Sequence, residues 1–280
     1  MRGNLFVGFL TGGQLGDLGS SLSWAEEHGF KSISIAAPPQ NNILNIPEVL
    51  SDPTRVKAVL RDSKAIVSAI GFYGNPIHND LATRKANKDY FIRVVEACHK
   101  LEVPVATGWI GLYQGSVEDN VREFKKEWPD IVRKAEDLGV KIAIENCTAN
   151  IAYRPDIWEK LFEAIPSSSL GLEFDPSHLI FQLMDAVEVA DRFGDRIFHT
   201  HMKDGQILWK RVSQYGMESG GVHLHRLPGF GDLNWAQFIS VLKKHHYDYA
   251  LSIEHEDPYF GYAEGLVLAR KFLDRFVVDT

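Results

Sequence analysis

Short apolar segments rich in β-branched residues alternate along the whole chain with longer segments in which apolar residues recur at helical spacing. The short segments predict strands at residues 5–10, 32–37, 65–72, 103–110, 141–147, 170–174, 197–201 and 250–254. The clearest helical segments are 81–101, 117–138, 185–193, 235–246 and 262–276. Alternating strands and helices predict an α/β protein with a parallel sheet, and eight repeats predict a closed (β/α)₈ TIM barrel.

The alternative to a barrel is an open, doubly wound sheet. Such a sheet usually carries a G-x-G-x-x-G phosphate-binding turn after its first strand. The segment 11–16 is rich in glycine but lacks that spacing, and the chain contains no Walker sequence. It also has no linker rich in Pro, Gly or Ser, so we expect residues 1–280 to form a single domain.

Composition excludes several classes of function. The formal net charge of −7 opposes binding to a phosphate backbone, so we expect no nucleic-acid partner. Cys98 and Cys147 are too few for a disulfide framework and suit a reducing compartment. The apolar N-terminal segment is short and is interpreted as a first strand, and no segment has the ~18 apolar residues of a membrane span. We therefore expect a cytoplasmic protein without a membrane partner.

Four consecutive predicted strands end in residues that can bind a metal. The fifth ends at Glu145, the sixth at Asp175, the seventh at His201 and the eighth at Glu254. Each has an ordinary explanation alone, such as a helix cap for Asp175. Carboxyl ends of barrel strands form one face, however, and clustered buried acids destabilise one another without a cation. The four together predict a divalent-metal site.

Three carboxylates and one imidazole form a hard, oxygen-rich donor set. Mn²⁺ is the first choice for such a set, with Mg²⁺, Co²⁺, Fe²⁺ or Zn²⁺ as alternatives. The absence of a thiolate ligand argues against a structural zinc. Four protein ligands leave one or two coordination positions for the oxygens of a substrate.

Other polar residues flank the predicted ligands. His178 falls in the first helical turn after Asp175; because the four-residue set is complete without it, we expect it to contact either a metal ligand or the substrate. His199 shares a strand face with His201 and is expected deeper in the barrel. Lys203 continues that face as a substrate-binding cation, and Asp204 is expected to orient Lys203 or to support a ligand.

The longest stretch without clear periodicity is 205–231, between the seventh and eighth strands. A loop of this length in a compact domain is usually functional. His223, His225 and Arg226 are expected to close over the substrate from this loop, the alternative being that they are exposed loop residues.

Aromatic residues near the ends of the third and fourth strands suggest a wall against which a sugar could pack. Trp109 is the main candidate, with Tyr73 and Phe72 beside it. Packing at the rim of the barrel is the alternative for each of them.

Several motifs together resemble a known superfamily. They are Glu145, D-P-S-H at 175–178, H-x-H-x-K-D at 199–204 and Glu254. This set is similar to the xylose isomerase-like TIM-barrel superfamily of sugar phosphate isomerases/epimerases, which includes ketose 3-epimerases, inosose dehydratases and endonuclease IV. The segments 174–179, 226–231 and 252–258 resemble a bacterial subgroup described only as sugar isomerase/epimerase.

The resemblance implies a function. Glu145, Asp175, His201 and Glu254 match the metal ligands of the superfamily, and Glu145 and Glu254 match its acid–base pair. His178 matches a substrate-contacting histidine. The implied activity is that of a sugar isomerase/epimerase, which transfers a proton on a keto-sugar or polyol through a metal-bound enediolate. No phosphate cradle is evident, so a non-phosphorylated small-molecule sugar is the expected partner, and a homo-oligomer is compatible with the sequence.

The chain departs from its superfamily at particular positions. Ketose 3-epimerases carry a Glu where this chain has Ile151 and an Arg where it has Ile207. A lyase or dehydratase, of the inosose type or one that eliminates from a 3-keto-glycoside, is therefore the alternative. Endonuclease IV is less well matched: His223 and His225 fall near its later ligands, but its earlier histidines have no counterpart. A non-catalytic sugar-binding barrel is also less favoured, because all four ligands are present.

Overall fold

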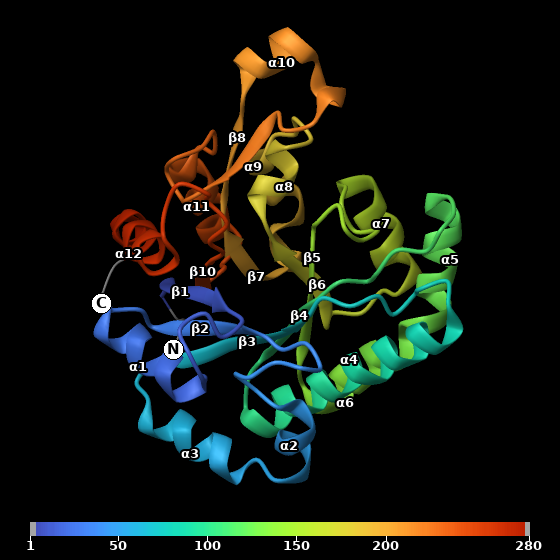
Figure 1. Ribbon diagram of the computed structural model, residues 1–280. Coiled ribbons are helices and arrows are strands. Elements are labelled where there is room, and N and C mark those ends of the chain that lie inside the picture. The colour runs from blue at the N-terminus through green and yellow to red at the C-terminus, as the bar shows by residue number, and fades with distance from the viewer. Residues whose placement is uncertain (1–3, 278–280) are drawn as a thin grey trace.

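The computed structural model describes residues 4–277, which form a closed barrel of parallel strands surrounded by helices (Figure 1). Around the barrel the strand order is β1-β10-β7-β6-β5-β4-β3-β2. These strands are β1 (Phe6–Thr11), β2 (Ser32–Ala36), β3 (Ile66–Phe72), β4 (Val105–Gly108), β5 (Lys141–Glu145), β6 (Leu170–Phe174), β7 (Ile197–Met202) and β10 (Ala250–Ile253). The predicted TIM barrel is confirmed, and the open sheet is excluded because β1 pairs with both β2 and β10.

The helices form an outer layer around the strands (Figure 1). They are α1 (Leu18–Glu27), α2 (Ile46–Ser51), α3 (Thr54–Asp62), α4 (Leu81–Leu101), α5 (Val117–Glu127), α6 (Pro129–Leu138), α7 (Pro155–Ala164), α8 (Pro176–Ile180), α9 (Ala186–Phe193), α10 (Trp209–Tyr215), α11 (Trp235–Lys244) and α12 (Tyr262–Leu273), with short 3₁₀ turns at Gly194–Arg196, Met217–Ser219 and Asp274–Phe276. Within residues 4–277, none of these helices is long and apolar enough to cross a membrane.

The segment 117–138 was expected to be one helix but forms two. α5 ends at Glu127, and α6 begins at Pro129. Proline has no N–H to donate to the preceding turn and disfavours helical continuation through its own position. Trp128 at the junction is fully buried, and its ring packs against Phe91 and Phe124 at centroid distances of 5.2 and 5.6 Å. The break therefore places a large aromatic side chain in the core.

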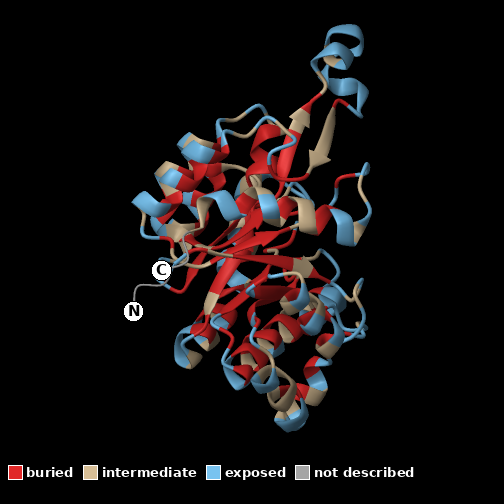
Figure 2. Ribbon diagram, turned by 90° about the vertical axis from the view of Figure 1, so that its left-hand side faces the viewer, coloured by how far each residue is buried: buried red, intermediate tan, exposed pale blue. Residues whose placement is uncertain are grey.

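The core lies between strands and helices and continues into the barrel interior (Figure 2). Interior positions also carry small polar side chains. Ser34 on β2 and Ser252 on β10 are joined by a hydrogen bond of 2.8 Å, although β1 separates their strands. The contact therefore crosses the inside of the barrel, where small hydroxyl side chains leave room for larger polar residues on neighbouring strands.

The stretch 205–231 is not irregular, as the sequence suggested, but contains an antiparallel ribbon. β8 (Asp204–Ile207) pairs with β9 (His223–Arg226), with Gly205 opposite His225 and Ile207 opposite His223. α10 caps the ribbon, which projects away from the barrel and is mostly exposed at its tip (Figures 1 and 2). Because β9 is short and its sequence, H-L-H-R, has a single apolar residue, it gives no hydrophobic alternation.

A buried carboxylate fixes the base of this ribbon. Asp204 Oδ2 accepts hydrogen bonds from the N–H groups of Gly229 and Gly231 and from the Trp235 indole at 2.7 Å. Its Oδ1 accepts from the N–H groups of Gly205 and Leu233. A Cβ on Gly231 would lie 2.4 Å from Asp204 Oδ1, so glycine permits the close approach. Burial raises the pKa of Asp204, and the hydrogen bonds oppose that shift.

The expectation that Asp204 orients Lys203 is therefore wrong. Its carboxylate accepts hydrogen bonds from the N–H of Gly205 on β8, from three backbone N–H groups of the loop after β9 and from the Trp235 indole at the start of α11. Those donors lie up to 31 residues away in the sequence, which is why residue spacing did not reveal them.

Asp204→Asn should destabilise the fold, because the amide NH₂ would face N–H donors that need an acceptor. We expect a loss of about 2–4 kcal/mol in the free energy of unfolding, measured with urea. The matched control is Asp195→Asn, whose carboxylate is 91% exposed; there we expect a change below about 0.5 kcal/mol. Equal stability of the two variants would contradict the assigned role of Asp204.

Candidate active site at the carboxyl ends of the strands

Four residues predicted from strand ends converge at one end of the barrel. Glu145 is the last residue of β5, Asp175 follows β6, His201 lies in β7 and Glu254 follows β10. One ligand atom from each lies within 4.8 Å of those of the others. In the register Glu145 pairs with Glu173, two residues before Asp175, and His201 pairs with Ser252, two residues before Glu254. The four residues therefore lie at the C-terminal ends of adjacent parallel strands, which meet at one mouth of the barrel.

Asp175 combines two roles. Its Oδ1 accepts hydrogen bonds from the N–H and the hydroxyl of Ser177, at 2.8 and 2.7 Å, and so caps α8, which begins at Pro176. Its Oδ2 accepts no such bond and lies 3.1 Å from Lys203 Nζ. Capping therefore holds the carboxylate so that the second oxygen faces the cluster.

Glu145 is held at both oxygens. Oε1 lies 3.1 Å from His201 Nδ1, and Oε2 accepts a hydrogen bond of 2.6 Å from the Trp109 indole. Burial alone would raise the pKa of this carboxyl, but the nearby imidazoles of His178 and His201 hold it well below its usual range. Glu145 is therefore an ionised, positioned oxygen donor.

Glu254 is the most exposed of the three carboxylates in the set. Its Oε2 lies 2.7 Å from Lys203 Nζ and 3.1 Å from His201 Nδ1. Burial would raise its pKa, but the charges of Lys203 and His201 lower it well below the ordinary value. The carboxylate is thus ionised at neutral pH and adjoins a lysine as well as the imidazole.

Lys203 lies inside the cluster rather than at its rim. The side chain is 2% exposed and contacts Asp175, Glu254 and Glu256, the last at 2.7 Å. Burial lowers the pKa of an ammonium, but these carboxylates outweigh burial and raise it well above the ordinary value. Lys203 therefore supplies one of the positive charges that balance the buried acids.

His178 adjoins two of the carboxylates. Its Nε2 lies 3.4 Å from Asp175 Oδ2 and 3.8 Å from Glu145 Oε1. Burial lowers its pKa, but Asp175, a hydrogen bond with Cys147 and Glu145 raise it to about 10. The structure thus places this histidine at the edge of the four-residue cluster.

The β8–β9 ribbon brings its histidines to the same region. The His223 ring stacks on Phe181 at 4.1 Å, and His225 packs edge-on against Phe181 at 4.9 Å. His225 Nδ1 lies 3.5 Å from Glu256, and its ring lies 6.2 Å from that of His178. The ribbon therefore forms one wall above the carboxylates.

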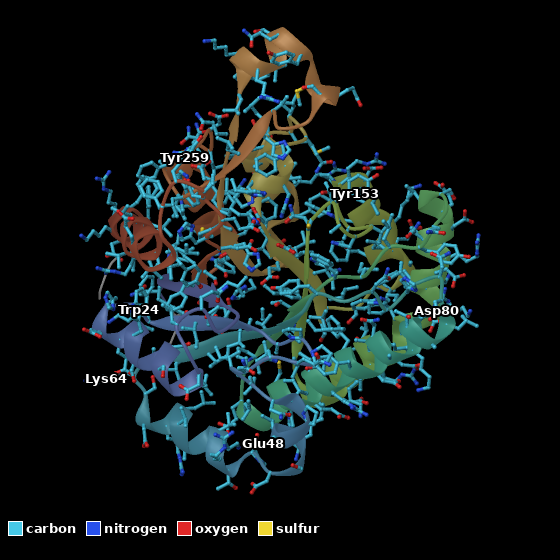
Figure 3. All side chains as sticks on the ribbon, viewed as in Figure 1. Trp24, Glu48, Lys64, Asp80, Tyr153 and Tyr259 are labelled. Atoms are coloured by element: carbon cyan, nitrogen blue, oxygen red, sulfur yellow. The ribbon has the colours of Figure 1, made fainter. Side chains whose placement is uncertain are left out.

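Arg226 has different contacts. Its Nε lies 3.2 Å from Asp257, and its guanidinium lies over the ring of Tyr259 at 5.0 Å. Tyr259, labelled in Figure 3, is itself largely exposed. Arg226 therefore links the ribbon to the loop after β10 instead of presenting an unpaired charge.

Aromatic side chains form the opposite wall. The rings of Tyr73 and Trp109 pack edge to face at 5.7 Å, and Trp109 reaches Glu145. Phe72 is buried and packs against Tyr90 and Phe91, so for this residue packing at the rim is the correct interpretation.

Two acidic residues near the cluster were missed by the sequence interpretation. Glu173, in the middle of β6, is fully buried and contacts both His199 and His201. Its only signal was a charged residue inside an apolar strand, on the same face as Asp175 by period two. Glu256 contacts Lys203 and was hidden in a run of charged residues after β10.

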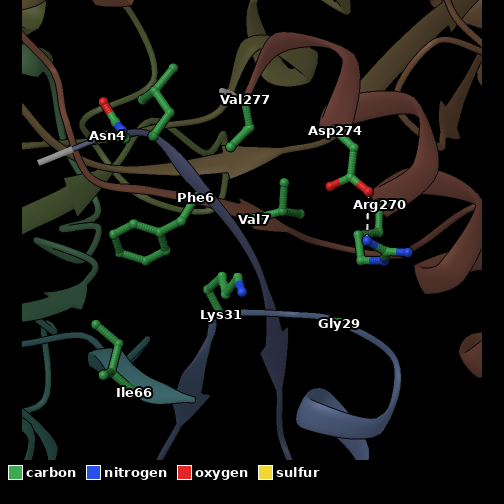
Figure 4. Close-up of a pocket in the computed structure, with 10 residues that line it drawn as sticks. Asn4, Phe6, Val7, Gly29, Lys31, Ile66, Arg270, Asp274 and Val277 are labelled. Atoms are coloured by element: carbon green, nitrogen blue, oxygen red, sulfur yellow. Dashed lines mark hydrogen bonds and ion pairs between the residues drawn. The ribbon is translucent and has the colours of Figure 1, made fainter. Parts of the chain in front are cut away.

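A separate pocket of about 640 Å³ lies at the other end of the barrel (Figure 4). It is lined by residues at the beginnings of the first strands, including Phe6, Lys31 and Ile66, and by the ion pair between Arg270 and Asp274. None of the cluster residues lines it. In a TIM barrel this end usually serves stability rather than catalysis.

Known proteins match the chain in sequence. The family model described as xylose isomerase-like TIM barrel matches residues 22–275. The uncharacterized protein YfiH of Bacillus subtilis is 28% identical over 255 residues, which cover 76% of this chain and 80% of that protein. An inosose dehydratase of Clostridium perfringens is 27% identical over 150 residues, covering 50% of this chain and 49% of the dehydratase.

Solved structures match over nearly the whole chain. A xylose isomerase domain protein from Planctomyces limnophilus has a TM-score of 0.77 at 16% identity, covering 99% of this chain and 98% of that one. A D-tagatose 3-epimerase-like protein has a TM-score of 0.74 at 20% identity, covering 97% and 96%. The IolI protein with a bound zinc atom has a TM-score of 0.73 at 19% identity, covering 96% and 97%. At these identities the structures establish the fold, and together with the family model they confirm the resemblance: the chain belongs to the xylose isomerase-like TIM barrel family.

Proposed function

We propose that this protein is a divalent-metal-dependent sugar isomerase/epimerase acting on a keto-sugar or polyol. The observation that carries the proposal is the convergence of Glu145, Asp175, His201 and Glu254, whose ligand atoms lie within 4.8 Å of one another. They come from four neighbouring strands at the end of the barrel where TIM-barrel enzymes hold their active sites. Epimerases and dehydratases among the similar proteins support the same class of chemistry.

The donor set fits a divalent cation. Three carboxylates lie together, and the buried Asp175 Oδ2 accepts no hydrogen bond. Lys203 offsets part of the negative charge, and a metal would offset more. The oxygen-rich set favours Mn²⁺, with Mg²⁺, Co²⁺, Fe²⁺ or Zn²⁺ as alternatives. Zinc in the structurally similar IolI protein supports a metal at such a site.

When bound, the metal would act as a Lewis acid that polarises a substrate carbonyl and acidifies the neighbouring C–H bond. The acid–base work then falls to Glu145 and Glu254. One ionised carboxylate removes the proton from carbon and becomes a carboxylic acid. In an isomerisation this acid returns the proton to the adjacent carbon. In an epimerisation the opposite carboxylate first takes up a proton from solvent and delivers it to the opposite face, and the first carboxyl then releases its proton to solvent. Their strands, β5 and β10, are separated in the barrel by β6 and β7, so the two groups approach from opposite sides.

The surrounding residues suggest how a substrate would be bound. We propose that Trp109 packs against the sugar and that His178, Lys203, His223 and His225 contact its hydroxyl groups. Arg226 is a weaker candidate, because it is paired with Asp257. Lys203 is likewise paired with carboxylates, which favours a non-phosphorylated substrate.

A dehydratase of the same fold is the second candidate. The inosose dehydratase relative covers about half of the chain, and Ile151 and Ile207 are buried apolar residues where ketose 3-epimerases carry Glu and Arg. The first proton transfer would be the same. A β-hydroxyl would then leave with a proton from an acidic side chain, and water and an unsaturated product would result.

The reaction class can be decided by one screen of the purified protein with Mn²⁺. Keto-sugars, inososes and 3-keto-glycosides would be incubated with the enzyme, and epimers, isomers and elimination products would be separated by chromatography. An epimer or isomer supports the first candidate, whereas an unsaturated product supports the dehydratase. Binding without turnover of any of the three substrate classes would favour the sugar-binding barrel.

Asp175→Asn should weaken metal binding while it preserves the fold, because the amide oxygen can still cap α8. For the wild type we expect saturating Mn²⁺ to raise Tm by about 5–10 °C, measured by calorimetry. The variant should lose most of that shift. Glu256→Gln is the matched control, since Glu256 contacts Lys203 but lies outside the proposed ligand set. Equal shifts in both variants would count against Asp175 as a ligand.

Glu254→Gln should abolish exchange of the substrate C–H proton with solvent, because the amide cannot accept it. We expect a fall of about 100-fold or more in the rate of deuterium incorporation, followed by NMR in D₂O. Glu256→Gln should retain measurable exchange. Unchanged exchange in Glu254→Gln would remove Glu254 from the acid–base role.

A further inference from the structure

A chain of polar side chains lies beneath the candidate site, within the barrel. Glu173 Oε1 lies 2.9 Å from His199 Nδ1 and 3.1 Å from His201 Nε2. Its Oε2 accepts a hydrogen bond of 3.0 Å from the Tyr73 hydroxyl. His199 Nε2 in turn lies 3.2 Å from Ser68 Oγ. Glu173, His199 and His201 are fully buried, so these contacts are shielded from bulk solvent.

The two nitrogens of His201 face different partners. Nδ1 lies 3.1 Å from both Glu145 and Glu254, on the side of the proposed metal ligands. Nε2 lies 3.1 Å from Glu173 Oε1 in an ion-pair contact and forms no hydrogen bond with any of the described residues. If Nδ1 donates its lone pair to a metal, Nε2 must carry the proton, and a carboxylate 3.1 Å away stabilises that N–H.

Glu173 also supports a second ligand by an indirect route. Its Oε2 holds the hydroxyl of Tyr73, whose ring packs edge to face with Trp109. Trp109 donates its indole N–H to Glu145 Oε2 at 2.6 Å. Oε1 of the buried Glu173 therefore contacts His201 directly. Its Oε2 supports Glu145 indirectly, through Tyr73 and Trp109.

We propose that Glu173 is the positioning residue of the candidate metal site: it orients the His201 imidazole so that Nδ1 faces the metal, and it fixes Tyr73 behind Trp109 and Glu145. The proposal rests on the proposed function, since it assumes that a divalent metal binds to the four-residue set. Glu173 itself touches neither metal nor substrate in this proposal.

A second metal between Glu173, His199 and His201 is the competing interpretation, because their ligand atoms also lie within 4.8 Å of one another. Three observations argue against it. Glu173 Oε1 already has a hydrogen-bonding partner in His199, Oε2 has one in Tyr73, and His201 would have to bridge two ions. Full burial of all three residues also removes the open coordination position that a catalytic ion needs.

The test compares Mn²⁺ affinity of the full-length, metal-free protein by isothermal titration calorimetry. Glu173→Gln should weaken Mn²⁺ binding by about 10–100-fold, as expected when a partner of a metal-bound histidine is lost. Ser68→Ala is the matched control. It removes the hydroxyl that contacts His199, which is not a proposed ligand, and it should change the Mn²⁺ affinity by less than about twofold. Circular dichroism and the Tm of the metal-free proteins establish that each variant is folded.

A second measurement tests the contact directly and does not need activity. In the Zn²⁺-loaded wild type, NMR of ¹⁵N-labelled histidine should show a slowly exchanging Nε2–H proton on His201, because Glu173 accepts it. In Glu173→Gln that proton should move upfield, since an amide oxygen is a weaker acceptor than a carboxylate. An Nδ1–H form of His201 in the loaded wild type would overturn the proposal even if Glu173→Gln fails to fold.

The outcomes separate this proposal from the proposed function. If the wild type binds Mn²⁺ and Glu173→Gln binds it with equal affinity, the positioning role is wrong and the metal site stands. If the wild type binds no divalent metal, both the positioning role of Glu173 and the proposed metal-dependent function are wrong. If Glu173→Gln lowers affinity and shifts the His201 proton while Ser68→Ala does neither, the positioning role is supported whether the enzyme proves to be an epimerase or a dehydratase.

Discussion

Mutual repulsion among buried carboxylates is the constraint on which this structure depends. Glu145, Asp175 and Glu254 lie within a few ångströms of one another at the mouth of the barrel. Burial disfavours each charge, and each neighbouring anion disfavours it further. The chain offsets part of this with the cations of Lys203 and the neighbouring histidines, and hydrogen bonds from Ser177 and Trp109 hold the oxygens in place. A cluster arranged in this way is suited to a divalent cation.

The barrel and the convergence of four strand-end residues could be predicted from the sequence, because both follow from local patterns. An apolar run that stops at a charged residue marks a strand end, and parallel strands in a barrel present those ends together. Glu145, Asp175, His201 and Glu254 were found in this way. His199 was also placed correctly in the interior, since period two puts it on the same face as His201 at a greater depth.

What could not be predicted depends on contacts between distant residues. Asp204 follows Lys203 in the chain, yet its carboxylate accepts hydrogen bonds from residues 25 to 31 positions later. In the sequence Glu173 is an ordinary strand residue; only the pairing of β6 with β7 brings His199 and His201 beside it. Lys203 appeared to be a free cation because its partner Glu256 lies 53 residues further on. Spacing in the sequence carries no trace of such pairs.

The β8–β9 ribbon begins directly after Lys203, and its outer part contributes none of the four clustered carboxylate and imidazole groups. The buried Asp204 anchors its base, while its tip around α10 is exposed. Mutations in that outer part can therefore accumulate without disturbing the residues that would perform proton transfer. The barrel strands thus carry the clustered carboxylates, and α10 is an exposed appendage whose shortening would leave the strand ends that hold the cluster in place.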